Sequence, residues 1–145
     1  MRIDAEFDCD VKSIAMHKDE DTGMLTMTPK VSVLVGSEAC AEMFGDDVHR
    51  LAFVAGLGAV GYDKIKPRVV AEKHVLSIAG GDSVPTLPVV DSIEPSNVAE
   101  VRVYLKLPFV YKDKADAIKL IDGLMHGLRV RLQPAQMELP IGEAA

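Results

Sequence analysis

A chain of 145 residues, 48% hydrophobic and 26% charged, has the size and composition of one folded domain, residues 1–145. Such a chain buries roughly 68% of its unfolded surface, so neither disulfide bonds nor a metal is needed to hold it together. The formal net charge of -6 argues against a partner that is held by its phosphates, because such binding needs clustered Lys and Arg.

Targeting signals are absent from the sequence pattern. No apolar run approaches the ~18 residues that cross a bilayer, and the first residues lack the apolar core of a signal peptide. Two cysteines far apart do not form a disulfide framework. We therefore expect a cytoplasmic protein that makes no contact with a membrane.

The first predicted elements are two strands, 2–12 and 24–35, in which apolar and polar residues alternate. Alternation with period two is typical of a half-buried strand. The phase slips after Ser13, which a β-bulge explains. Residues 17–23 are rich in turn formers and end in a glycine, so the two strands form a hairpin. Pro29 cannot donate to a ladder, which places that part of the second strand at an edge or a bulge.

A short helix and a closing strand are expected to complete the first half. The helical segment 38–44 has Ser37 as its N-cap, and Gly45 ends it. The apolar segment 48–53 is predicted to be the closing strand of this half.

The second half repeats this order of elements. Strands are predicted at 68–78 and 100–110, a helix at 112–126 and a closing strand at 128–132, with Gly127 as a left-handed helix cap. The apolar residues of the helix form one stripe, which should face the sheet. The stripe consists of Ala115, Ile118, Ile121, Leu124 and Met125.

The repeated order predicts an α+β fold, an antiparallel or mixed β-sheet with two helices on one face. It also suggests an internal duplication of a β-hairpin–helix–strand unit, with half-repeats 1–54 and 68–139 and a linker at 55–67. Residues 80–97 contain three prolines and are predicted to form a long irregular loop. The expected shared core consists of Phe7, Val33, Val103, Leu105, Phe109, Ile118, Ile121 and Leu124.

One glycine motif could bind a phosphate. Gly56, Gly58 and Gly61 have the G-x-G-x-x-G spacing that receives a pyrophosphate at a helix N-terminus. However, Pro67 follows six residues after the last glycine, and the next segment is predicted to be a strand, so the crossover is too short for a βαβ unit. We favour a flexible linker, and phosphate binding stays the alternative.

Catalytic and metal-binding patterns are scarce, so we predict neither an enzyme nor a cofactor. No pair of histidines has i, i+4 spacing, and no C-x-x-C completes a zinc site. Cys9 falls on the apolar side of its strand and Cys40 beside the apolar stripe of the short helix, so both are interpreted as small core residues. The histidines are His17, His49, His74 and His126.

Four carboxylates occupy one face of the first strand: Asp4, Glu6, Asp8 and Asp10. Neighbours on one face of a strand are roughly 6.6–6.8 Å apart, close to the spacing of phosphates along a nucleic-acid strand. Such a face can imitate a nucleic-acid backbone and occupy a basic groove on another protein.

A purely structural interpretation of the same carboxylates is that they keep an edge strand soluble or pair across the sheet with Arg102 and Lys106. Those two residues share one face of their strand, and Arg129 and Arg131 share one face of the closing strand. These four residues form a candidate local basic patch, but the solvated side of a sheet explains them better.

The two ends of the chain resemble uncharacterised small proteins of bacteriophages and prophages. The resemblance lies in 127–139 (GLRVRLQPAQMEL), a strand followed by a short tail with Gln and Glu, and in 7–14 (FDCDVKSI). It implies an accessory role, such as an inhibitor of host defence or a replication or assembly factor, and carries over no catalytic residues.

The sequence thus favours a non-enzymatic protein-interaction or inhibitor module that acts through the acidic strand face. The alternatives are a nucleotide or nucleic-acid binding module and a structural component of a phage particle. We also expect a homodimer, formed through an edge strand or paired hairpins. The predicted binding residues are Asp4, Glu6, Asp8, Asp10, Arg102, Lys106, Arg129 and Arg131.

Overall fold

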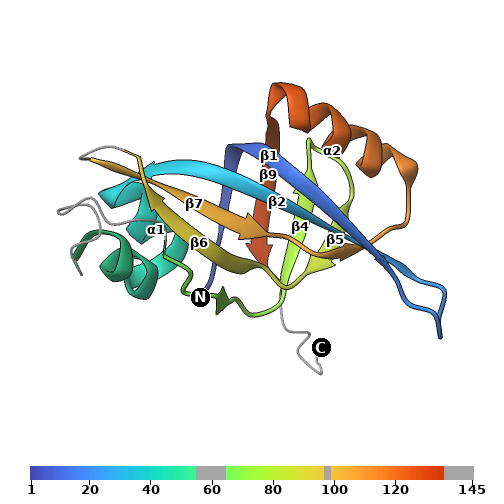
Figure 1. Cartoon of the computed structure of the whole chain (residues 1–145), viewed down its shortest axis with the longest axis horizontal. Helices are drawn as coiled ribbons and strands as arrows, with labels where there is room; N and C mark the ends of the chain where they lie inside the picture. Colours follow the sequence, from blue (N-terminus) through green and yellow to red (C-terminus); the bar gives the residue numbers. More distant parts are fainter. Residues whose placement is uncertain (55–64, 97–98, 136–145) are drawn as a thin grey trace, which may run out of the picture.

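The computed structural model describes residues 1–54, 65–96 and 99–135 and has the predicted α+β class, with nine antiparallel strands and two α-helices (Figure 1). No helix in this part of the chain is long and apolar enough to cross a membrane. The strands are β1 Ala5–Lys18, β2 Leu25–Gly36, β3 Val69–Val70, β4 His74–Ile78, β5 Ser83–Thr86, β6 Val89–Pro95, β7 Glu100–Lys106, β8 Phe109–Val110 and β9 Leu128–Pro134. The helices are α1 Ser37–His49, the π-helical turn η1 Arg50–Val54 and α2 Lys114–His126.

The long strand β1 joins two parts of the sheet. Its residues 5–9 pair with β9, and its residues 10–18 pair with β2. The register shifts between Val11 and Ser13, so β1 has the predicted bulge, slightly before the position after Ser13 where the sequence placed it. Figure 1 shows the consequence: β9, β4 and β5 run steeply across β2, β7 and β6.

The hairpin turn and the proline of β2 follow the sequence pattern. Gly23 has a φ of +73°, the left-handed conformation that the turn requires. Pro29 lies where β2 changes its neighbour from β8 to β7, and its carbonyl accepts a hydrogen bond from the backbone N–H of Leu107. The missing N–H of the proline therefore falls at a break in the ladder.

Segment 80–97 is where the prediction of a long irregular loop is wrong, because β5 and β6 occupy most of it. Pro85 lies in β5, an edge strand whose one partner among the described strands is β4. Pro88 lies at the bend between β5 and β6, where it removes no donor from a ladder. The sheet is an open path of neighbouring strands in the order β3-β6-β7-β2-β1-β9-β4-β5, with β8 also paired to β2.

The predicted closing strand at 48–53 is also wrong, because α1 continues to His49 and is followed by η1. The buried residues recur every four positions, which is a helical spacing. They are Cys40, Phe44, Val48 and Ala52. The two halves of the chain therefore do not repeat the same order of elements.

The start of α1 differs from the prediction as well. The N-cap position belongs to Gly36 and no side chain caps the helix, so Ser37 is not the N-cap. Gly45, with a φ of +86° and a ψ of 177°, has non-helical backbone, so the first helical segment of α1 ends there as predicted and a second segment follows the kink. Gly127 likewise ends α2 with a φ of +79°, as predicted, and Asp113 caps its start.

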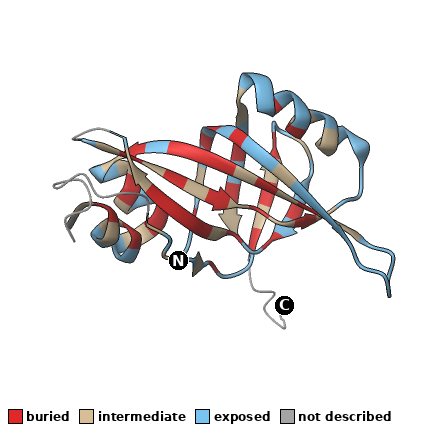
Figure 2. Cartoon of the chain, in the orientation of Figure 1, coloured by how far each residue is buried: buried red, intermediate tan, exposed pale blue. Residues whose placement is uncertain are grey.

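One hydrophobic core cluster joins the inner face of the strands with Cys40, Phe44 and Val48 of α1 and Leu120 of α2. The two helices cover this apolar side at opposite ends of the molecule (Figures 1 and 2). The strand residues of the predicted core are buried, which confirms them: Phe7, Val33, Val103, Leu105 and Phe109.

The prediction that three residues of α2 belong to the core is wrong. Ile118, Ile121 and Leu124 are exposed, because α2 packs through Leu120 and Gly123. Apolar residues occur on both sides of this helix, so their spacing alone does not decide which side meets the sheet.

Candidate functional site on the charged outer face of the sheet

The four predicted carboxylates are exposed; Glu6, Asp8 and Asp10 lie on the outer face of β1 and Asp4 directly precedes the strand, and we call the four together the acidic column. By contrast, the intervening Phe7 and Cys9 are buried in the core. The side chains of Asp8 and Asp10 are 80% and 61% exposed. The predicted alternation is therefore confirmed.

Strand β9 brings an arginine to one side of the acidic column. The Nε of Arg129 donates a hydrogen bond to the Oε2 of Glu6 at 3.1 Å, and its Nη1 donates to the Oδ1 of Asp8 at 3.1 Å. These bonds, first that of Asp8 and then that of Glu6, raise the pKa of the Arg129 guanidinium. The Arg129 side chain is 53% exposed, so water screens the attraction and the pairs add little to stability.

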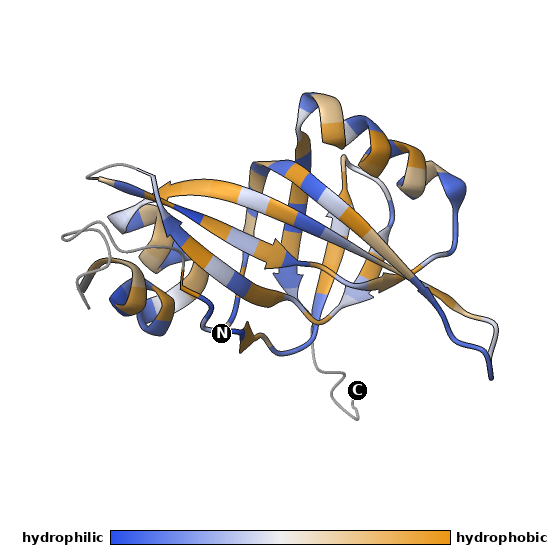
Figure 3. Cartoon of the chain, in the orientation of Figure 1, coloured by the Kyte–Doolittle hydropathy of each residue, from blue (hydrophilic) through white to orange (hydrophobic). Residues whose placement is uncertain are grey.

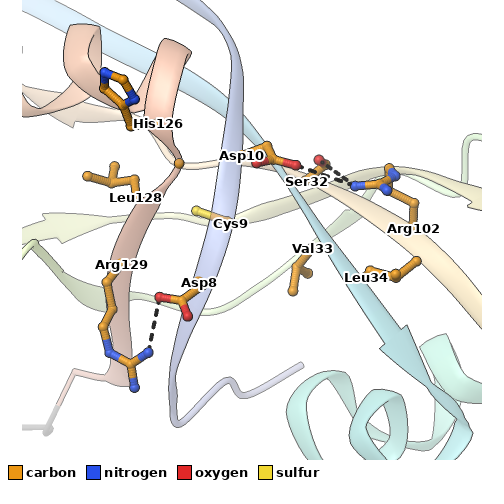
Figure 4. A pocket seen from close by; sticks show the side chains of 11 residues that line it. Asp8, Cys9, Asp10, Ser32, Val33, Leu34, Arg102, His126, Leu128 and Arg129 are labelled. Atoms are coloured by element: carbon orange, nitrogen blue, oxygen red, sulfur yellow. Dashed lines mark hydrogen bonds and ion pairs between the residues drawn. The ribbon is translucent and has the colours of Figure 1, made fainter.

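Strand β7 brings a second arginine to the other side. The Nη1 of Arg102 lies 3.7 Å from the Oδ2 of Asp10 and donates a hydrogen bond to the Oγ of Ser32 at 3.3 Å. Pairing across the sheet with Arg102 was the purely structural interpretation of the carboxylates, and Asp10 forms this pair. In Figure 4 the two arginines reach the acidic column from opposite sides of β1.

A groove of about 610 Å³ opens where β1 exchanges β9 for β2 as its partner (Figure 4). Carboxylates and arginines of the outer face line it, together with the exposed Leu34 of β2 and His126 at the end of α2. The groove is thus polar, carries both signs of charge and has one apolar wall.

Lys106 does not belong to this site, because it pairs with Asp91 of β6 instead. The Nζ of Lys30 lies 3.2 Å from the Oδ2 of Asp91, and the Nζ of Lys106 lies 3.5 Å from its Oδ1. Although burial acts to raise the pKa of Asp91, the hydrogen bond and charge of Lys30 and the charge of Lys106 lower it overall. A register shift between Val90 and Ser92 bulges β6 at this residue.

Two predicted residues remain outside these networks. Asp4 and Arg131 are exposed, and neither forms an ion pair with another described residue. Arg131 lies opposite Glu6 in the register of β1 and β9, although Glu6 bonds to Arg129.

The buried thiols and one buried imidazole have structural surroundings. Burial, followed by the charges of Asp10 and Asp8, raises the pKa of Cys9 to about 12, and burial raises that of Cys40 to about 11. Thiols of this kind stay protonated and are poor nucleophiles. The Nε2 of His74 accepts from the backbone N–H of Ile3 at 2.8 Å, so its Nδ1 carries the proton and donates to the carbonyl of Glu72.

Sequence reasoning missed a contact between Ser37 and His49, whose Oγ and Nε2 lie 2.7 Å apart. Such a contact is one component of a nucleophilic site. No carboxylate bonds to His49 within the described residues, and its ring stacks on Phe53 with 5.4 Å between ring centroids. The bond instead ties the first residue of α1 to its last.

Neither a search for metal-binding groups in the described residues nor a comparison with known proteins identifies a second site. No group of His, Cys, Asp and Glu in the described ranges could hold a metal ion, and the glycine motif at 56–61 lies outside those ranges. No family model, no curated protein and no solved structure matches this chain. The functional interpretation therefore comes from the charges and geometry of the chain itself.

Proposed function

We propose that this protein is a non-enzymatic protein-interaction module of the inhibitor type, which binds a basic surface of another protein through the acidic column. The observation that carries the proposal is the surplus of exposed carboxylate on one strand face. Two arginines bond to three of the four carboxylates, Glu6, Asp8 and Asp10, and Asp4 has no ion pair among the described residues.

Stability does not account for the acidic column. Side chains as exposed as those of Asp8 and Asp10 interact through water, where ion pairs gain little and salt screens them. Like charges at neighbouring positions of one face also repel each other. An opposing basic surface would relieve this repulsion and would speed the encounter between the two proteins.

The groove beside the acidic column suits a long basic side chain. Asp8 and Asp10 line it and would receive the cation, while the exposed Leu34 offers an apolar surface to the methylene stem. An arginine fits this chemistry best, because its planar fork bonds to two carboxylate oxygens at once.

The other function classes receive less support from the same geometry. A phosphate near Arg102 or Arg129 would also approach the carboxylates that bond to them, which opposes nucleic-acid binding. The high pKa values of both thiols disfavour cysteine chemistry. The proposed module suits a phage accessory protein in the cytoplasm of an infected cell. This is the kind of role that the resemblance of residues 7–14 and 127–139 to small phage proteins implies.

The test compares neutral variants at two places. The column variant replaces three carboxylates by their isosteric amides: Asp4→Asn, Glu6→Gln and Asp8→Asn. A control variant makes the same change of charge at three exposed positions elsewhere: Glu20→Gln, Asp21→Asn and Glu42→Gln. Each protein is immobilised, challenged with a bacterial lysate, and melted in solution.

We expect wild type and control to capture the same basic protein, and the column variant to lose it while its melting temperature changes little. A melting temperature that falls together with the capture would make the carboxylates structural and would contradict the proposal. Melting with ADP and with a DNA oligonucleotide tests the alternative, since a ligand that binds the folded state raises its stability.

A further inference from the structure

Helix α2 presents an apolar stripe to solvent. Ile118, Ile121 and Met125 are 61%, 59% and 80% exposed, and Leu124 beside them is 46% exposed. Spacings of three and four residues place the first three on one side of the helix. Figure 3 shows hydrophobic segments along α2, and Figure 2 shows most of the same helix exposed.

Packing prevents α2 from turning this stripe inward. A Cβ added to Gly123 would lie 2.8 Å from the Cγ2 of Val11 and 3.1 Å from the Cβ of Leu128, so only glycine allows the close approach. Leu120, which is 1% exposed, fills the core on the same side. The Nζ of Lys119 also donates to the carbonyl of Ile78 at 3.3 Å. The orientation of the helix, and with it the exposure of the stripe, is therefore fixed.

We propose that this stripe binds the same stripe of a second copy, with the two α2 helices antiparallel about a two-fold axis. The charges of the helix support this occupant. Lys114 lies on the stripe at its start, and Asp122 borders it near the end. An antiparallel pair centred on Ile118 brings Lys114 of each copy level with Asp122 of the other, whereas a parallel pair would oppose like charges.

The size of the stripe sets the strength of this contact. A helix of 13 residues is about 20 Å long and offers four apolar side chains. This is less than the ~800 Å² per partner of a standard interface, so the dimer should be weak and should dissociate on dilution. The acidic column is a separate surface on the outer face of β1, so the two proposals can fail independently.

Sedimentation equilibrium of the full chain, from low micromolar to near-millimolar concentration, tests the dimer. We expect the mass to rise from 15.7 kDa toward twice that value. Ile121→Asp should abolish the rise. Met16→Asp, a matched change at a 65% exposed residue of the β1–β2 hairpin, should leave it intact.

Charge reversal tests the geometry without touching the apolar residues. Lys114→Asp should weaken association several-fold, and the double variant Lys114→Asp with Asp122→Lys should restore it. A negative charge near the start of α2 and a positive charge near its end both interact favourably with the helix dipole, so neither substitution should destabilise the fold. A monomer at every concentration, a dimer that survives Ile121→Asp, or a double variant that associates no better than the single one would overturn the proposal.

Discussion

Two adjacent residues of α2, Leu120 and Ile121, should differ strongly in what truncation to alanine does to stability. Leu120 is 1% exposed and belongs to the hydrophobic core, whereas Ile121 is 59% exposed. Removing a buried leucine side chain loses its transfer free energy and leaves a cavity, which together cost about 2–5 kcal/mol. Truncating Ile121 should change the free energy of unfolding by less than about 0.5 kcal/mol, since it leaves no cavity and alanine favours helix.

Urea unfolding followed by circular dichroism measures both changes at a dilution where the chain is monomeric. For a domain of this size a loss of 1 kcal/mol lowers Tm by roughly 2–4 °C, so Leu120→Ala should melt roughly 4–20 °C below wild type. Ile121→Ala should melt within roughly 2 °C of wild type. If Ile121→Ala proves the more damaging of the two, α2 faces the sheet with its other side, and the proposed dimer loses its basis.

Three further changes test the packing and charge networks. Gly123→Ala should cost about 1–3 kcal/mol, because its methyl group has no room against β1 and β9. Asp91→Asn should cost roughly 1–3 kcal/mol near neutral pH. The lowered pKa of Asp91 means that its contribution is present above the ordinary value of 3.8 and is lost as the pH falls through the native value, so the deficit measured by unfolding should shrink in acid. Finally, Cys9 and Cys40 should resist a thiol-specific dye at pH 8 until the chain is unfolded, and rapid labelling of the native protein would contradict their burial.

The hairpin of β1 and β2 was predictable because one pattern determines it. Alternation over many residues specifies which side chains turn inward, and a single phase slip marks the bulge between Val11 and Ser13. Gly23 and Gly127 were predictable because positive φ favours glycine. The acidic column followed from the same alternation.

The errors arose where two patterns compete. Segment 48–53 is short and apolar, which suits a strand, yet Val48 and Ala52 continue the four-residue spacing of α1. In α2 both sides carry apolar residues, and the inward side is specified by the close approach of Gly123 to Val11, a tertiary contact that no local pattern reveals. Hydrophobic periodicity therefore predicted the helix but not its orientation.

The pairing of the site residues was predictable only in part. Asp10 and Arg102 lie on strands whose faces could be assigned, and they do meet. The partner of Lys106 was missed because Asp91 lies in a segment whose prolines disguised it as a loop, and because a bulge directs that side chain. Bulges and tertiary ion pairs of this kind depend on which strands become neighbours.

The spacing of the acidic column allows a direct test of the proposed function with defined ligands. Strand neighbours on one face are roughly 6.6–6.8 Å apart, so an extended peptide that alternates arginine and threonine matches the carboxylates, whereas one with all its arginines in a block does not. Both peptides carry the same charge, so any difference between them reports spacing and not net attraction.

The decisive measurement is a titration of the labelled chain with each peptide, followed by NMR at low and at physiological salt. We expect the alternating peptide to bind more tightly than the block peptide, to shift the resonances of β1 around Asp8, and to weaken as salt is added. The variant with amides at Asp4, Glu6 and Asp8 should lose this preference, while the control variant keeps it. Equal binding of both peptides, or an unchanged preference in the column variant, would contradict a function for the acidic column.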